Sequence, residues 1–354
     1  MKNIILVFVL FIHAAVGCQK KNSSPISPKV HMSLFAESKN QWTGIAISKN
    51  KRVFVSFPRW SADTPVSVAE IINGKTIPFP DAAWNRWNEG TGSKNQFICV
   101  QSVYIDELNQ LWILDTGYDL RTDVTQGAFL YCFDLRNNNL KVKYTLSVEK
   151  ISPKAYLNDF RIDNQNHSVY FTDSQVGGIV VLDMITADVR RVLSNHHSTL
   201  AEADKIVIEG YERKHPVHSD GIAIDPDKKY LYYCALMGKN IYRIPISSLL
   251  NKNLSDDSLQ ATVEKYAEST ANDGIIFDKK GNLYLSSLEK NAISRIDKNR
   301  ILSEIISDPE IKWPDSFAFD NAGNLYFTIS QIHLPKEKRT KYKIFRLKFY
   351  NKTE

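Results

Sequence analysis

Residues 220–225 read Asp-Gly-Ile-Ala-Ile-Asp, and after a short polar stretch residues 231–233 read Leu-Tyr-Tyr. The motif combines a polar residue, a small residue, an apolar run that closes on Asp or Ser, a turn and a second apolar run. Two short apolar runs that flank a turn are typical of a β-hairpin. The small residue suits a position where several strands converge, and the closing Asp can accept hydrogen bonds from the following turn. We call this pattern the hairpin motif.

The hairpin motif occurs six times, and its copies begin at residues 43, 101, 158, 220, 273 and 315. Successive copies start roughly 40 to 60 residues apart, which is the length of one four-stranded propeller blade. Further strand-like runs lie between the copies, as a four-stranded blade requires. Six blades that close into a ring leave no exposed sheet edges, whereas an open sheet would. We therefore predict an all-β fold, a six-bladed β-propeller over residues 30–350.

Two segments at opposite ends of the predicted propeller indicate how the ring closes. After its two inner strands, the sixth blade has only one further strand-like run, Tyr-Lys-Ile-Phe-Arg-Leu-Lys-Phe at residues 342–349. The apolar run at residues 30–36 precedes the first copy of the motif and has no sheet of its own. We predict that these two segments pair, so that the N- and C-terminal strands complete a single blade.

The first 29 residues differ in character from the rest of the chain. Residues 1–17 have a basic start, an apolar core too short to span a membrane stably, and small residues at the end, as in a signal peptide. Cys18 follows Ala-Val-Gly, which resembles a bacterial lipobox, although Ala15 stands where Leu is most usual. We predict a signal peptide over residues 1–17, lipidation of Cys18 and a flexible tether over residues 18–29. Simple secretory cleavage is the alternative.

Leader, charge and cysteines bear on location and partners. The leader predicts an exported protein, located as a lipoprotein in the outer membrane, the periplasm or on the cell surface, and otherwise secreted. We expect membrane contact only through the lipid anchor.

The net charge of +6 comes from 45 basic and 39 acidic residues spread along the chain, so we expect no nucleic-acid partner. Cys99, Cys132 and Cys234 lie in apolar runs and are predicted to be buried free thiols.

The first polar residues of the six copies should surround one end of the central channel, because all copies begin equivalently. These residues are Thr43, Gln101, Asn158, Asp220, Asp273 and Asp315. Three carboxylates and two amides at an apolar-walled mouth suit a cation, either a protonated amine or a hard metal ion such as Ca²⁺. The ring contains no histidine, which disfavours zinc. Alternatively, these residues only cap the turns into the innermost strands.

Aromatic side chains and one histidine accompany the predicted ring. Trp313 lies just before the sixth copy, Trp42 just before the first, and Trp60 lies on a nearby loop. Each could stack on a planar ligand, and packing in the propeller core is the alternative. His218 precedes the fourth copy and could carry protons at the mouth, or it is a solvated loop residue. The sequence contains no motif for covalent hydrolysis or nucleotide binding.

Several longer stretches resemble the Yellow/major royal jelly protein family. The most specific are Leu-Trp-Ile-Leu-Asp-Thr-Gly at residues 111–117 and Trp-Pro-Asp-Ser-Phe at residues 313–317. Further matches, such as Phe-Pro-Arg-Trp at residues 57–60, follow in order over nearly the whole predicted propeller. Leu108 occupies the position of a cysteine that insect members usually carry, so the resemblance does not imply their disulfide.

The resemblance implies an extracellular six-bladed propeller with a small-molecule site at one mouth of its channel. Some family members resemble dopachrome-converting enzymes, some bind biogenic amines, and others have no known activity. We expect this chain to bind a small cationic or aromatic ligand, with Gln101, Asn158, Asp220, Asp273, Asp315 and Trp313 as the binding residues. Dopachrome-tautomerase-like isomerase activity is left open, because a shared fold does not settle catalysis.

Two other classes of function stay open from the sequence. A metal-dependent lactonase or esterase of the gluconolactonase type would use Asn158, Asp220 and Asp273 to hold Ca²⁺ or another divalent cation. That pattern also needs a glutamate before the glycine of the first copy, where this chain has Thr43. A protein-interaction scaffold is the third class. A stoichiometric divalent ion in the purified protein would distinguish the lactonase from the other two.

Overall fold

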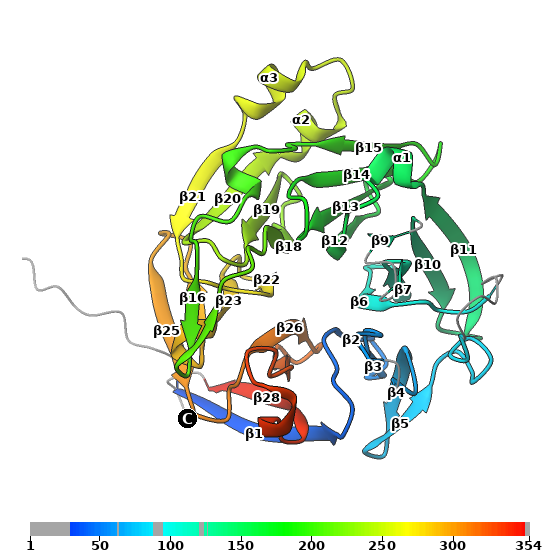
Figure 1. Ribbon diagram of the computed structural model, residues 1–354, viewed down its shortest axis with the longest axis vertical. Helices are drawn as coiled ribbons and strands as arrows, with labels where there is room; N and C mark the ends of the chain where they lie inside the picture. Colours follow the sequence, from blue (N-terminus) through cyan, green and yellow to red (C-terminus); the bar gives the residue numbers. More distant parts are fainter. Residues whose placement is uncertain (1–28, 62–63, 88–94, 120–123, 126, 351–354) are drawn as a thin grey trace, which may run out of the picture.

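The computed structural model describes residues 29–61, 64–87, 95–119, 124–125 and 127–350. These residues form six four-stranded antiparallel sheets arranged in a ring (Figure 1). Each sheet is one blade, so the prediction of an all-β, six-bladed β-propeller is confirmed. The predicted signal peptide, Cys18 and most of the tether lie outside the described residues. Among the helices that the structure describes, none has the length and hydrophobicity needed to cross a membrane.

The first three blades follow one another along the chain. The first contains β2 (Ile45–Ile47), β3 (Val53–Ser56), β4 (Val68–Ile72) and β5 (Lys75–Pro78). The second contains β6 (Val100–Ile105), β7 (Gln110–Asp115), β10 (Ala128–Asp134) and β11 (Asn139–Leu146). The third contains β12 (Leu157–Asp163), β13 (Ser168–Asp173), β14 (Ile179–Asp183) and β15 (Val189–Val192).

The remaining blades complete the ring. The fourth contains β18 (Ser219–Ile224), β19 (Tyr230–Ala235), β20 (Asn240–Pro245) and β21 (Glu264–Glu268). The fifth contains β22 (Ile275–Phe277), β23 (Leu283–Ser287), β24 (Ala292–Ile296) and β25 (Leu302–Ser307). The sixth contains β26 (Pro314–Phe319), β27 (Leu325–Ile329), β28 (Tyr342–Tyr350) and β1 (Lys29–Ser38). In every blade, one copy of the hairpin motif supplies the first two strands.

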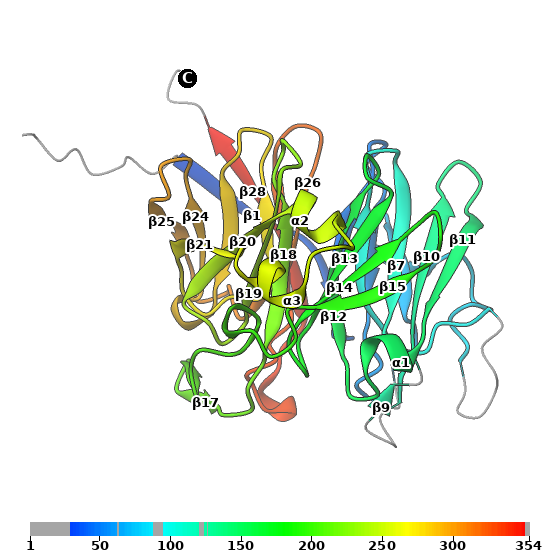
Figure 2. The same cartoon turned by 90° about the horizontal axis from the view of Figure 1, so that it is seen from above.

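Two small hairpins lie outside the blades. They are formed by β8 (Tyr118–Asp119) with β9 (Val124–Thr125), and by β16 (Ile206–Ile208) with β17 (Tyr211–Arg213). Figure 2 shows β9 and β17 at the same end of the ring. The described helices are all short: α1 (Val148–Ile151), α2 (Ile246–Leu250), α3 (Asp256–Gln260) and the 3₁₀ turns η1 (His197–Thr199), η2 (Leu288–Lys290) and η3 (Lys336–Lys338).

The N- and C-terminal strands close the ring in the sixth blade. β1 pairs antiparallel with β28, and the register runs from Lys29 opposite Tyr350 to Ser38 opposite Tyr342. β28 pairs in turn with β27, which belongs to the sixth copy of the hairpin motif. The predicted pairing of residues 30–36 with residues 342–349 is therefore confirmed. β1 includes Lys29, the last residue of the predicted tether.

The small residues of the hairpin motif lie where neighbouring inner strands approach each other. A Cβ atom on Gly274 would lie 2.2 Å from the backbone oxygen of Asp315, and one on Gly221 would lie 2.4 Å from that of Asp273. A larger side chain would therefore push adjacent blades apart. The same close approach brings the polar residue before each glycine towards its counterpart in the next blade.

The closing Asp of the motif caps the turn that follows it, as predicted. The Asp278 carboxylate accepts hydrogen bonds from the backbone N–H groups of Lys280 and Asn282 at 2.8 and 2.9 Å. Asp320 accepts equivalent bonds from Ala322 and Asn324, both at 2.9 Å. These bonds fix the turn between the two inner strands of each blade.

Apolar side chains pack between neighbouring blades. Tyr170 on β13 and Tyr233 on β19, for example, belong to one buried cluster although they lie in the third and fourth blades. Cys99, Cys132 and Cys234 are buried and free, as predicted. The interface between blades is thus the hydrophobic core of the fold, and burial of this surface is the main source of its stability.

Candidate functional site

The inner strands of the ring begin at a cavity of about 670 Å³. Five of the six residues that start the hairpin motifs line this cavity, and Trp313 lines it as well. The lining residues that were predicted to bind a ligand are Gln101, Asn158, Asp220, Asp273, Asp315 and Trp313. The repeat therefore places residues from five successive blades around one opening. We call this cavity the acidic mouth.

Other residues singled out from the sequence lie in different places. Thr43 is fully buried and absent from the lining of the acidic mouth, and its hydroxyl donates to the backbone oxygen of Gln101 at 2.9 Å. Trp42 is fully buried and its indole N–H donates to the Lys343 carbonyl at 3.2 Å. The His218 ring accepts from the Ala201 N–H at 3.0 Å. Thr43 and Trp42 thus make structural contacts. His218 is half-buried and its ring is bonded to the backbone, which differs from the expected solvated loop residue.

A chain of hydrogen bonds runs along one side of the acidic mouth. The Trp60 indole N–H donates to the Tyr156 hydroxyl at 2.8 Å, and that hydroxyl donates to the Gln101 side-chain oxygen at 2.8 Å. The Gln101 amide then donates to the Asn158 oxygen at 2.9 Å, and the Asn158 amide donates to Asp220 at 2.7 Å. Each residue of this chain donates to the next, and the chain ends at the carboxyl group of Asp220.

The indole of Trp313 lies on the other side of the acidic mouth. The Trp313 N–H donates to Asp273 at 2.7 Å, and the Trp313 side chain is almost fully buried. The backbone of Trp313 has a φ of 60°, in the left-handed region that non-glycine residues rarely adopt. Such a conformation costs free energy, which the Asp273 bond and the packing of the indole help to offset.

The three carboxyl groups of the acidic mouth have strongly perturbed pKa values. Burial raises the pKa of Asp220 well above its usual range, and the nearby charge of Asp315 raises it further. Burial raises the pKa of Asp273, and the charge of Asp220 raises it further. Burial and the charge of Asp273 likewise raise the pKa of Asp315. The side chains are exposed by only 2, 8 and 4%, so a bare negative charge is costly at each of them.

Arg213 also lines the acidic mouth, and the sequence analysis did not identify it. It belongs to β17, and its guanidinium lies over the Trp313 ring, 5.6 Å from the ring centroid. Burial lowers the pKa of Arg213, while the charges of Asp273 and Asp220 act to raise it. The signal for this residue was indirect: the third and fourth copies of the motif have the widest spacing, which leaves room for the β16–β17 hairpin.

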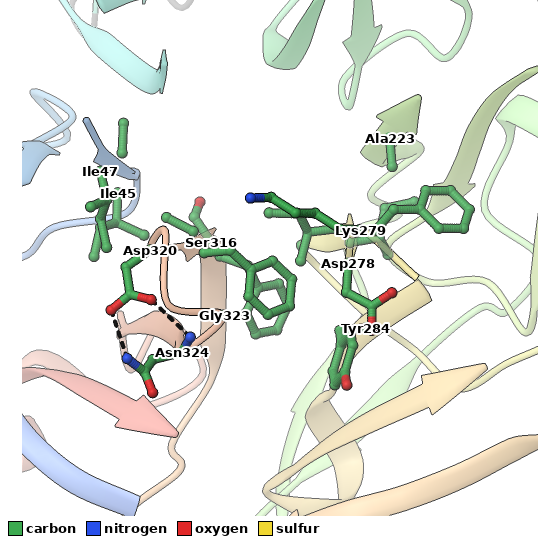
Figure 3. Close-up of a pocket in the computed structure, with 18 of the residues that line it drawn as sticks. Ile45, Ile47, Ala223, Asp278, Lys279, Tyr284, Ser316, Asp320, Gly323 and Asn324 are labelled. Carbon is green, nitrogen blue, oxygen red and sulfur yellow. Dashed lines mark hydrogen bonds between the residues drawn. The ribbon is translucent and has the colours of Figure 1, made fainter. Parts of the chain in front are cut away.

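A second cavity, of about 730 Å³, lies at the end of the inner strands where the closing Asp residues are found (Figure 3). Its walls include Ile45, Ile47 and Ala223, and Lys279 extends into the opening. Two of the lining carboxylates, Asp278 and Asp320, cap their own turns, as the paired hydrogen bonds between Asp320 and Asn324 show. The third, Asp159, forms an ion pair with Arg161 at 2.8 Å. The buried carboxyl cluster belongs to the acidic mouth.

Comparison with known proteins identifies the family. The model described as "Major royal jelly protein" matches residues 98–351, which is more than half of the chain. The chain belongs to the major royal jelly protein family. The resemblance drawn from its sequence motifs is confirmed.

Curated members of the major royal jelly protein family share low sequence identity with this chain. Major royal jelly protein 3 of Apis mellifera is 21% identical over 234 residues, which cover 64% of this chain and 42% of the relative. Protein yellow of Drosophila guanche is 27% identical over 143 residues, which cover 36% of this chain and 25% of the relative. The matched region spans about half the length of the royal jelly proteins or less, so their activities are not transferred.

Solved structures with the same fold include several propeller enzymes. A luciferin-regenerating enzyme aligns with a TM-score of 0.58 and 12% identity over 90% of this chain and 95% of the other. A gluconolactonase from Xanthomonas campestris aligns with a TM-score of 0.56 and 14% identity, over 91% and 90% of the two chains. At such identities the likeness shows the propeller fold alone.

Asn158, Asp220 and Asp273 are the residues predicted to hold a divalent cation. Among the residues that the structure describes, no group of three or more His, Cys, Asp or Glu side chains is arranged to hold a metal ion. Asn158 directs its amide nitrogen, not its oxygen, at Asp220, and its oxygen accepts from Gln101. In this arrangement the Asn158 oxygen is already engaged by the Gln101 amide. Metal binding by these residues stays a prediction.

Proposed function

We propose that this member of the major royal jelly protein family is an exported propeller that binds a small cationic or aromatic ligand at the acidic mouth. The observation that carries the proposal is the convergence of three buried carboxyl groups in one cavity with aromatic walls. Asp220, Asp273 and Asp315 supply the carboxyl groups, and Trp60 and Trp313 supply indole rings. Few monomeric cores collect three acids in this way without a functional reason, because their mutual repulsion is destabilising.

A cationic ligand would relieve this repulsion. An ammonium group placed between the carboxyl groups stabilises their ionised form, so a proton is released as the cation binds. Three N–H donors of the ammonium match the acceptor oxygens of Asp220, Asp273 and Asp315. Burial strengthens each of these charge-assisted hydrogen bonds relative to the same bond in water. The carboxyl groups thus select an amine over a neutral ligand of similar shape.

The walls of the acidic mouth favour a ligand with a flat ring. Trp60, Tyr156 and Trp313 all line the cavity, and the two indole N–H groups and the Tyr156 hydroxyl are engaged in the hydrogen bonds described above. These bonds hold the rings in place before a ligand arrives, which lowers the entropy cost of binding. An aromatic amine therefore matches both the charge and the shape of the site.

The same groups could carry out a tautomerisation of the dopachrome type. An ionised carboxylate would remove a proton from a carbon next to a carbonyl or quinone methide, and a neighbouring protonated carboxyl would return a proton to an oxygen. Asp220 and Asp273 suit these two roles, since burial raises both pKa values while their interaction is unequal. The charge of Asp220 raises the pKa of Asp273, whereas the hydrogen bond from Asp273 lowers the pKa of Asp220. Carboxyl pairs with raised pKa values are suited to acid–base work near neutral pH.

The test is a titration of the protein with aromatic amines, comparing the parent with the double variant Asp220→Asn/Asp273→Asn. Asn can still accept from the Asn158 amide and the Trp313 indole, so we expect a melting temperature equal to or above that of the parent. Affinity for the amine should fall by about 10- to 100-fold, the value of one or two charge-assisted hydrogen bonds. Asp204→Asn, an exposed site outside the cavity, serves as the control.

Three results would contradict this proposal. Unaltered amine affinity in the double variant would leave the carboxyl groups with a turn-capping role only. A stoichiometric divalent ion in the purified parent, lost in the double variant, would instead favour the metal-dependent lactonase or esterase. If the parent binds no amine, no aromatic compound and no metal, the protein-interaction scaffold becomes the better hypothesis.

A further inference from the structure

Arg213 is a charged side chain at the acidic mouth, and one of its guanidinium donors is unpaired. Its Nε atom is buried and has no hydrogen-bond partner among the described residues. The observed contact of its guanidinium is with the face of Trp313. Buried donors are nearly always paired in native structures, so an unpaired guanidinium N–H beside a cavity requires an explanation.

The contacts of the β16–β17 hairpin hold Arg213 in position, beginning with its pairing opposite Ile206. Glu209, in the turn of the same hairpin, accepts from the Asn291 amide at 3.0 Å and contacts the His333 ring nitrogen at 2.9 Å. The His333 ring in turn stacks on Trp313, with an interplanar angle of 12° and 6.0 Å between ring centroids. These contacts fix the hairpin relative to the indole, so they also fix the position of Arg213 at the acidic mouth.

Opposite charges thus meet at a single indole. Trp313 donates its N–H to Asp273, and its ring face carries the Arg213 guanidinium. A simple amine that enters this cavity would gain the carboxyl groups but would also meet the positive charge of Arg213. A ligand with an ammonium and a carboxylate would satisfy both, because guanidinium groups bind carboxylates with a matched pair of N–H donors.

We propose that the acidic mouth takes a zwitterionic aromatic α-amino acid, and that Arg213 is the specificity residue that binds its carboxylate. The ammonium lies against Asp220 and Asp273, and the aromatic ring packs against Trp60 and Tyr156, which line the same cavity. This inference rests on the proposed function and names the ligand class of the same site. The competing explanation is that Arg213 only offsets the negative charge of the carboxyl groups.

The experiment compares pairs of ligands that differ only in the carboxylate, namely tryptophan with tryptamine and tyrosine with tyramine, by calorimetric titration. The parent should bind at least one amino acid about 10-fold or more tightly than its decarboxylated amine. In Arg213→Met, which keeps apolar contact with Trp313, affinity for the amino acid should fall about 10- to 100-fold. Affinity for the amine should stay equal or rise, because a repelling charge has been removed.

Two further variants keep the result interpretable. Lys154→Gln removes a different positive charge from the same cavity, and it should change amino acid affinity less than about threefold, as expected for an exposed charge. Arg213→Lys keeps the positive charge but cannot bind a carboxylate with two parallel N–H donors. It therefore tests the role of Arg213 even if Arg213→Met does not fold. It should still lose about 5-fold or more in amino acid affinity.

The possible outcomes separate this inference from the proposed function. Equal or tighter binding of the amines by the parent, or equal losses in Arg213→Met and Lys154→Gln, would overturn the role of Arg213. The proposed function would survive either result. Failure of the parent to bind amines and amino acids alike would overturn both.

Discussion

At the scale of single residues, the buried carboxyl groups of the acidic mouth determine how the protein responds to pH. Asp220, Asp273 and Asp315 have pKa values well above those of aspartate in an unfolded chain, which are about 3.9. The folded state therefore binds more protons than the unfolded state once the pH exceeds that value. Stability due to these groups is fully present at low pH and is lost as the pH rises towards their folded pKa values.

We predict a measurable pH dependence of stability in the ligand-free protein. As the pH is raised from about 4 to 8, the triple variant Asp220→Asn/Asp273→Asn/Asp315→Asn should lose less free energy of unfolding than the parent, because it lacks the groups that must ionise. Urea denaturation at several pH values gives both slopes. Asp204→Asn should follow the parent. Parallel curves for the parent and the triple variant would show that these carboxyl groups titrate normally.

At the scale of secondary-structure elements, the repeat explains what could and could not be predicted. Every copy of the hairpin motif places its first residue at the same end of its blade, so Asn158 and Asp273 could be assigned to one mouth from sequence alone. Thr43 occupies the same position in its copy, but its hydroxyl is buried and donates to the Gln101 backbone oxygen of the adjacent blade. Arg213 could not be assigned, because the β16–β17 hairpin lies between the third and fourth blades, outside the repeated hairpin motif.

The closing strand of the sixth blade provides a second test. Deletion of residues 342–354 removes β28, which leaves β1 and β27 without their shared partner. Leu347 and Ile344 are fully buried, and the loss of such side chains costs about 2–5 kcal/mol each. We expect a large fall in melting temperature or failure to fold, followed by thermal denaturation with circular dichroism. A variant lacking only residues 351–354 is the control, and equal melting of the two truncations would contradict ring closure by β28.

At the scale of the whole molecule, the predicted leader and the propeller bear on where the site is located. We propose that Cys18 carries a lipid, so that the polar segment after it connects the membrane surface to β1. This would place the acidic mouth outside the cytoplasm, where it meets ligands from the surroundings of the cell. The sequence pattern Ala-Val-Gly-Cys at residues 15–18 supports the proposal.

The anchor can be tested directly. Mass spectrometry of the protein expressed in a bacterium with two membranes should show an N-terminal Cys18 with added acyl chains, and fractionation should place the protein in the outer membrane. In Cys18→Ser the lipid acceptor is absent, so the protein should leave the membrane fraction. An unmodified mature N-terminus in the parent would favour simple secretion.

The pairing of β1 with β28 also has a mechanical consequence. Because Lys29 lies opposite Tyr350, the two ends of the propeller leave it side by side from one corner of one blade. A force that pulled these ends apart would load the hydrogen bonds one after another, as in opening a zipper, and would not load them all together in shear. A propeller held by its N-terminus is therefore weakest against tension at the point where the ring was joined.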